Sequence, residues 1–262
     1  MQTDIIVDTK GMACPMPIVK AKKALDGLQA GQTMEVISTD KGSINDFQAW
    51  VKQTKHELIE HKEDNGVYKF YVRKLSFTRS ELVHRINSIP RTSSLLGNRE
   101  RRNLITKENT TIVLFSGDLD KAIAAFIIAN GAAAFDHEVT IFFTFWGLNT
   151  LRKDELVKTR KGILEKAFGW MMPRGARKLG LSRMNFGGMG PQMIKHVMKK
   201  HNALSLPQLI ELAQEQGVKL VACTMTMDLL GLKQEELIDD LEYAGVAAYL
   251  GDASNARVNL FI

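Results

Sequence analysis

The chain has 262 residues, of which 45% are hydrophobic and 24% charged, with 20 Gly, 6 Pro and only 2 Cys. This is the composition of an ordinary globular protein, and it excludes the disordered, collagen-like and disulfide-stapled classes. The formal net charge of +6 is uneven, because residues 73–107 and 152–178 contain nine basic side chains each. The length predicts one large domain or two modest ones, since a domain averages roughly 150 residues.

The compartment we expect is the cytoplasm. No run of about 18 uncharged apolar residues occurs, so no membrane span is predicted. The first residues, Met-Gln-Thr-Asp, lack the basic segment followed by an apolar one that marks a signal peptide. Two cysteines in a reducing compartment argue against a structural disulfide.

Residues 1–74 are predicted to form the first domain. The elements are a strand at 5–7, a helix at 15–28, a strand at 34–37, a helix at 43–51 with Ser43 as its N-cap, and strands at 57–63 and 67–72. The last two strands flank Asp64-Asn65-Gly66, which is a strong hairpin signal. The order β-α-β-α-β-β predicts a two-layer α/β sandwich, with both helices on one face of a four-stranded sheet.

Residues 75–109 are predicted to be a basic linker with a short helix in its first half. Residues 110–262 then alternate between strands and helices. Strands are predicted at 111–115, 139–145, 219–223, 246–250 and 258–262, and helices at 119–135, 191–201, 206–216 and 234–243. Helices between parallel strands predict a doubly wound three-layer α/β/α domain with a mainly parallel sheet, interrupted by a basic insertion at 148–184.

Cys14 stands in Gly11-Met12-Ala13-Cys14-Pro15-Met16-Pro17. Proline is favoured in the first helical turn, so Pro15 and Pro17 predict that Cys14 is the N-cap of the helix that follows. There the helix dipole, aided by Lys10, Lys20, Lys22 and Lys23, would favour the thiolate, which can attack sulfur and hold a persulfide. The alternative is a small buried N-cap residue without chemistry.

A Cys-Pro-x-Pro motif at a helix start, after a strand and within this order of elements, resembles the TusA/SirA-like sulfur-carrier family over about residues 3–74. Asp40-Lys41-Gly42 after the second strand fits the same likeness. The resemblance implies that Cys14 carries sulfane sulfur as a persulfide and passes it to a partner protein. It also implies that Pro15 and Pro17 shape the helix.

Cys223 ends the predicted strand at 219–223, and doubly wound sheets place their sites at such strand ends. Thr224 and Thr226 follow and could donate hydrogen bonds to a sulfur anion. The other reading is that Cys223 is a core residue, because cysteine is among the most buried residue types. The residues alone leave these two readings even.

Three segments of the second half resemble the DsrE/DsrF-like family over about residues 109–262. They are Ser116-Gly117-Asp118-Leu119-Asp120-Lys121, Phe143-Thr144-Phe145-Trp146-Gly147-Leu148 and Met184-Asn185-Phe186-Gly187-Gly188-Met189-Gly190-Pro191. The likeness is best to a subgroup with the segment Ala222-Cys223-x-Met225. It implies a sulfurtransferase-related domain that forms homo-oligomers and uses Cys223 to accept or relay persulfide sulfur.

The glycine-rich segment around Gly187 and Gly188 has three readings: a flexible turn before a helix, a lid over Cys223, or an anion-binding loop. It lacks the Lys-Ser/Thr that completes a phosphate loop, so a nucleotide site is disfavoured. We expect no metal, because no two histidines have the i, i+4 spacing of a helical metal site. No cofactor and no nucleic-acid partner are expected either.

The sequence therefore predicts a sulfur-relay protein or sulfurtransferase with persulfide on Cys14, on Cys223 or on both. Its partners would be sulfur donor and acceptor proteins, rhodanese-like or other persulfide proteins, with small sulfur anions as further donors. Two alternatives stay open. One is a scaffold or regulator that binds a sulfurtransferase without turning over sulfur, and the other is a redox sensor with a reversible Cys14–Cys223 disulfide.

Overall fold

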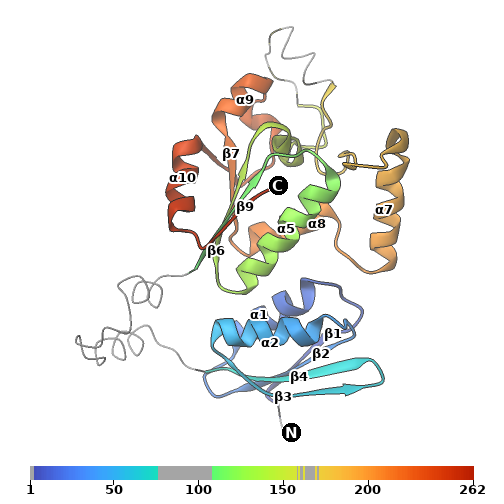
Figure 1. Cartoon of the computed structure of the whole chain (residues 1–262), viewed down its shortest axis with the longest axis vertical. Helices are drawn as coiled ribbons and strands as arrows, with labels where there is room; N and C mark the ends of the chain where they lie inside the picture. The colour runs from blue at the N-terminus through green and yellow to red at the C-terminus, as the bar shows by residue number, and fades with distance from the viewer. Residues whose placement is uncertain (1–2, 76–107, 158, 160–161, 163–168, 170) are drawn as a thin grey trace, which may run out of the picture. The chain divides into compact units, whose positions relative to one another are not determined.

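A computed structural model of the chain describes residues 3–75, 108–157, 159, 162, 169 and 171–262. These residues divide into two compact α/β units (Figure 1). Most of the predicted basic linker at 75–109 lies outside the described residues, so its role as a linker stays a prediction.

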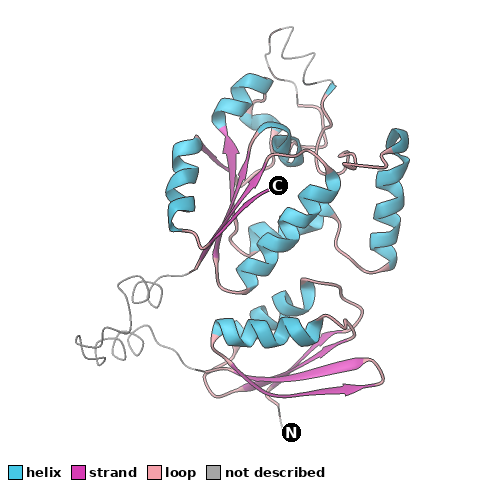
Figure 2. Cartoon of the chain, in the orientation of Figure 1, coloured by secondary structure: helices cyan, strands magenta, loops and turns pink. Residues whose placement is uncertain are grey.

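The N-terminal unit confirms the predicted order β-α-β-α-β-β. Its elements are β1 (Ile5–Thr9), α1 (Met16–Gly27), β2 (Thr33–Ser38), α2 (Ser43–Thr54), β3 (Glu57–Asp64) and β4 (Val67–Arg73). The sheet has the strand order β1-β2-β4-β3, and α1 and α2 pack on one of its faces (Figure 2). The fully buried rings of Phe47, Trp50 and Phe70 form the core between helix and sheet, with Phe47 stacked on Phe70 at 4.4 Å between centroids.

Strands β1 and β2 pair in parallel, with Thr9 opposite Ser38 at their carboxyl ends. The other pairs of this sheet are antiparallel. Parallel neighbours end at the same edge of a sheet, so the loops after β1 and β2 emerge side by side. This pairing brings two segments together that lie about 28 residues apart in the chain.

The C-terminal unit contains a five-stranded sheet of strand order β8-β7-β6-β5-β9, in which every pair is parallel. Its strands are β5 (Asn109–Leu114), β6 (Glu138–Phe143), β7 (Lys219–Cys223), β8 (Glu242–Ala244) and β9 (Val258–Phe261). Among the described residues of this unit, the α-helices with given bounds are α5 (Leu119–Ala134), α7 (Met189–Lys200), α8 (Leu206–Glu215), α9 (Thr224–Leu230) and α10 (Val246–Asn255). Short 3₁₀ helices are η1 (Phe145–Leu151), η2 (Phe186–Gly188) and η3 (Gln234–Glu236).

Helices lie on both faces of this sheet, which confirms the three-layer prediction (Figure 1). One face packs on α5 and α8 and forms the larger core around Ile112, Ile141 and Leu220. The alternate residues of the same strands face the side of α10 and form a small cluster with Tyr249. Alternation along each strand sorts the side chains between the two layers.

Two predicted elements of the C-terminal unit are wrong. Residues 234–243 form η3 and β8 rather than a helix, because the backbone pairs with another segment: the N–H of Ile238 donates to the carbonyl of Leu151 at 2.8 Å. Residues 246–250 begin α10 rather than forming a strand. A short apolar run fits a strand or a buried helix equally well, so periodicity could not separate them.

The longest helix of the described residues is α5, with 16 residues. Its apolar side packs into the larger core through Ala122, Phe126 and Ala129. Within the described ranges, no helix is both long enough and apolar enough to cross a membrane.

Candidate functional site

Cys14 lies in the loop between β1 and α1, and its side chain is exposed. The loop is held beside the one that follows β2, because the N–H of Gly11 donates to Oγ1 of Thr39 at 2.8 Å. The N–H of Met12 donates to the carbonyl of Thr9 at 3.1 Å and turns the chain back after β1. The sulfur is thus presented at the edge of the sheet where two parallel strands end.

The start of α1 differs from the prediction by one residue. The N-cap is Pro15, and Pro17 is the second helical residue, so Cys14 stands just before the cap. Neither proline has an N–H, and the N–H of Met16 donates to the carbonyl of Ala13 at 3.0 Å. Few N–H groups of the first turn therefore remain to stabilise an anion at the sulfur.

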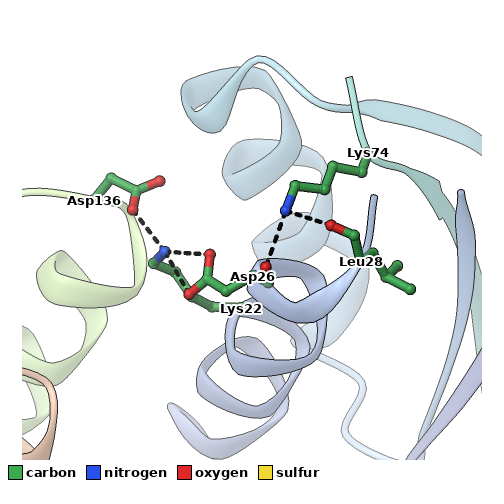
Figure 3. A network of polar contacts seen from close by, with 5 residues as sticks. All are labelled: Lys22, Asp26, Leu28, Lys74 and Asp136. Atoms are coloured by element: carbon green, nitrogen blue, oxygen red, sulfur yellow. Dashed lines mark hydrogen bonds and ion pairs between the residues drawn. The ribbon is translucent and has the colours of Figure 1, made fainter. Parts of the chain in front are cut away.

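The charges around Cys14 are also different from those expected. Desolvation of the sulfur, followed by the negative charges of Asp46 and Asp40, raises the pKa of the Cys14 thiol. The sequence predicts the opposite direction, from lysines near Cys14 in the chain. Lys10 instead pairs with Asp8 at 3.2 Å, and Lys22 pairs with Asp26 at 3.0 Å, one turn further along α1 (Figure 3).

Of the two carboxylates, Asp40 lies on the loop between β2 and α2, and Asp46 lies in the first turn of α2. The hydroxyls of Ser38 and Ser43 are buried and 2.8 Å apart, so Ser43 bonds to the end of β2, while the N-cap of α2 is Gly42 rather than Ser43. Oδ1 of Asp40 accepts the N–H of Gly42 at 3.2 Å. Partial burial and the neighbouring Asp40 raise the pKa of the Asp46 carboxyl.

The far end of α1 is tied to the end of β4. Nζ of Lys74 donates to the carbonyls of Asp26 and Leu28, at 3.1 and 2.8 Å (Figure 3). These bonds satisfy carbonyl groups that the last turn of a helix leaves open. They fix α1 at the end opposite to Cys14.

Cys223 ends β7, as predicted, and its backbone pairs with Ala244 of β8. Its side chain is only 3% exposed and packs with Val113, Phe142 and Val221 on the face toward α10. It is also the residue before α9, which begins at Thr224. In this conformation Cys223 is a core residue, which is one of the two environments that the sequence left open.

The residues predicted to support Cys223 differ in environment. Thr226 is fully buried, and its Oγ1 lies 2.9 Å from Oγ1 of Thr144, so it joins α9 to the end of β6. Thr224 is exposed. Gly187 and Gly188 have φ angles of +63° and +100°, which favour glycine, and both border α7. Their role as a lid stays a prediction.

Comparison with known families matches a different family to each of the two α/β units. A family model described as sulfurtransferase TusA matches residues 5–74, and a model of the DsrE/DsrF/DrsH-like family matches residues 106–261. The chain joins a TusA domain to a DsrE/DsrF/DrsH-like domain. Both resemblances found in the sequence are thereby confirmed.

Three relatives show how the similarity is distributed. The uncharacterized protein YrkE of Bacillus subtilis is 76% identical over 155 residues, which are 59% of this chain and 97% of that protein. The sulfur carrier protein DsrE2 of Allochromatium vinosum is 40% identical over 161 residues, 60% of this chain and 99% of that protein. The sulfur carrier protein TusA of the same bacterium is 47% identical over 68 residues, 26% of this chain and 90% of that protein.

The sequence did not predict carboxylates beside Cys14: Asp40 entered only through the family likeness, and Asp46 was not singled out. In the TusA domain, Asp40 and Asp46 are distant from Cys14 in the chain and reach it only because β1 and β2 end at the same edge. The predicted parallel order of the two strands held a signal for this, since the loops after parallel neighbours meet. In the described part of both domains, no cluster of three His, Cys, Asp or Glu residues is arranged to hold a metal ion.

Proposed function

We propose that the chain is a sulfur-relay protein that holds sulfane sulfur as a persulfide on Cys14 and passes it to the thiol of a partner. The observation that supports this is an exposed cysteine in the loop between β1 and α1 of a TusA domain. The names of the relatives support the same function, because proteins called sulfur carriers match each half of the chain.

The loading step is a thiol exchange that needs no added oxidant or reductant. The Cys14 thiolate attacks the outer sulfur of a donor persulfide, a new S–S bond forms, and the old one breaks. The electron pair of the broken bond stays on the donor cysteine, which leaves as a thiolate. The reverse exchange with an acceptor thiol unloads Cys14.

A second role is favoured for the DsrE-like domain by the burial of Cys223. Because this side chain is 3% exposed, transfer to it requires an opening of the surrounding structure. A domain that binds donor or acceptor without taking up sulfur needs no such opening. A relay role therefore predicts that sulfur moves from Cys14 to Cys223, whereas a docking role predicts that it stays on Cys14.

The partners we propose are donor and acceptor proteins with a reactive persulfide or thiol, such as rhodanese-like proteins. Two free thiols are suited to the reducing cytoplasm, where we place the protein. Self-association of the DsrE-like domain is supported by an exposed aromatic cluster, in which the ring of Phe115 is 5.2 Å from Phe145 and 5.7 Å from Phe261.

The test is the intact mass of reduced full-length protein after incubation with excess polysulfide, for the wild type, Cys14→Ser and Cys223→Ser. We expect a gain of about 32 Da, one sulfur atom, that a reductant removes and that Cys14→Ser abolishes. Cys223→Ser should still load, because Cys14 is the exposed thiol.

The outcomes separate the candidates. If sulfur placed on Cys14 later appears on Cys223, the second domain takes part in the relay. If it stays on Cys14 in the wild type, the DsrE-like domain is a docking module. If no variant gains sulfur, even from a protein persulfide donor, the carrier function is wrong and a scaffold role takes its place.

A further inference from the structure

Two carboxylates, one just after β2 and one at the start of α2, lie together next to the loop of Cys14. A methyl group on Gly42 would lie 3.6 Å from both carboxylate oxygens of Asp40 and 3.8 Å from Oδ2 of Asp46, so the two side chains stand on the same side of this loop. The loop is joined to that of Cys14 by the Gly11–Thr39 hydrogen bond and by the parallel pairing of β1 with β2. After desolvation of the sulfur, the negative charges of these two residues raise the pKa of the Cys14 thiol.

Two of the lysines at this end of the domain are paired with other carboxylates. Lys10, on the cysteine loop, pairs with Asp8, and Lys22, on α1, pairs with Asp26. The remaining lysines of these elements are Lys20 and Lys23 on α1 and Lys41 beside Asp40, of which Lys23 and Lys41 are exposed. The charges that raise the pKa of the Cys14 thiol, after desolvation of the sulfur, are those of Asp46 and Asp40.

We propose that Asp40 and Asp46 form a charge gate, which slows the reaction of Cys14 with anionic sulfur compounds and favours a donor that brings positive charge. The partner it fits is a protein whose persulfide-bearing cysteine is surrounded by Lys or Arg. Such a surface offsets the two carboxylates on docking, whereas polysulfide or thiosulfate approaches against their field. The choice of donor rests on the proposed function, but the gate itself is a property of the thiol.

The experiment compares two methanethiosulfonate reagents of opposite charge, one ending in trimethylammonium and one in sulfonate. Both modify the same thiolate, so the ratio of their rates cancels the thiolate fraction and reports the local field. The protein is the full chain with Cys223→Ser, in which Cys14 is the only thiol. The variants are Asp40→Asn, Asp46→Asn and the double variant, in which asparagine keeps an acceptor oxygen.

We expect the cationic reagent to react faster with the parent, and its advantage to fall about three-fold for each carboxylate removed. High salt should reduce the advantage in the parent and change the double variant little. Asp26→Asn is the matched control, because it removes the same charge ten residues from Met16 along α1, about 15 Å away. Circular dichroism confirms that each variant folds.

A ratio that is the same in the parent and the double variant would overturn the gate. An equal fall in Asp26→Asn would also overturn it, because the effect would then come from net charge alone. Failure of the carrier function has a different signature: the ratio responds as described while Cys14 takes no sulfur from any donor.

Discussion

Replacing Thr226 by valine tests whether the start of α9, directly after Cys223 in the chain, helps to keep this side chain buried. The two hydroxyl oxygens of Thr144 and Thr226 are 2.9 Å apart, and Thr226 is fully buried. This bond fixes the first turn of α9, which begins directly after Cys223. Valine keeps the branched shape of threonine and removes the bond.

The size of the effect follows from the bond that is lost. A neutral hydrogen bond contributes about 1 kcal/mol net, and a hydroxyl left without a partner at Thr144 adds to the cost. We expect the free energy of opening around Cys223 to fall by about 1 to 2 kcal/mol. Alkylation that depends on this opening would then be roughly 5 to 30 times faster.

The assay measures iodoacetamide uptake at Cys223 by mass spectrometry, in full-length protein that carries Cys14→Ser. Thr224→Val is the matched control, because it changes threonine to valine at the exposed first residue of the same helix and should leave the rate unchanged. The double variant Thr144→Val/Thr226→Val removes both partners and should react more slowly than Thr226→Val alone.

The reasoning is refuted if Thr226→Val and Thr224→Val react at the same rate. It is also refuted if Cys223 of the Cys14→Ser protein reacts as fast as Cys14 of the Cys223→Ser protein. In either case Cys223 is accessible without an opening of α9, and a relay through it needs no conformational change.

Two further predictions concern the DsrE-like domain. Glu236→Gln should lower the free energy of unfolding of this domain by about 3 kcal/mol, because it removes a negative charge beside the buried Arg152. Nη2 of Arg152 lies 3.8 Å from Oε2 of Glu236. Urea unfolding followed by circular dichroism measures the effect, and an unchanged midpoint contradicts it. Phe261→Ser should shift the protein toward the monomer in analytical ultracentrifugation, because it removes a 72% exposed ring from the aromatic cluster. A wild-type protein that is monomeric at high concentration would exclude self-association through this surface.

Local patterns were sufficient for most of the N-terminal domain. The Asp64-Asn65-Gly66 turn, the helical spacing of apolar residues after Cys14 and the two short apolar strands each act within a few residues, and the predicted elements are present. The position of Cys223 at a strand end was also readable, because a strand rich in apolar residues ends there.

Long-range pairing decided the parts that sequence patterns misassigned. Residues 234–243 have helix-forming composition, but Leu237 bridges to Arg152 and the N–H of Lys153 donates to the carbonyl of Glu236. These contacts join segments more than 80 residues apart, and no local propensity reports them. Tertiary context overrides propensity at such positions.

The two cysteines show the same division between sequence and structure. Their identity, the Cys-Pro-x-Pro motif and the strand-end position were determined by the sequence, because each depends on neighbours in the chain. Only the tertiary structure decided that Cys14 is exposed and Cys223 is buried, since burial depends on which elements pack together. The tertiary structure also brings Asp40 and Asp46 near Cys14, where their charges add to desolvation in raising the pKa of the thiol. The lysines adjacent in sequence do not lower it, because electrostatic interactions depend on distance in space rather than along the chain.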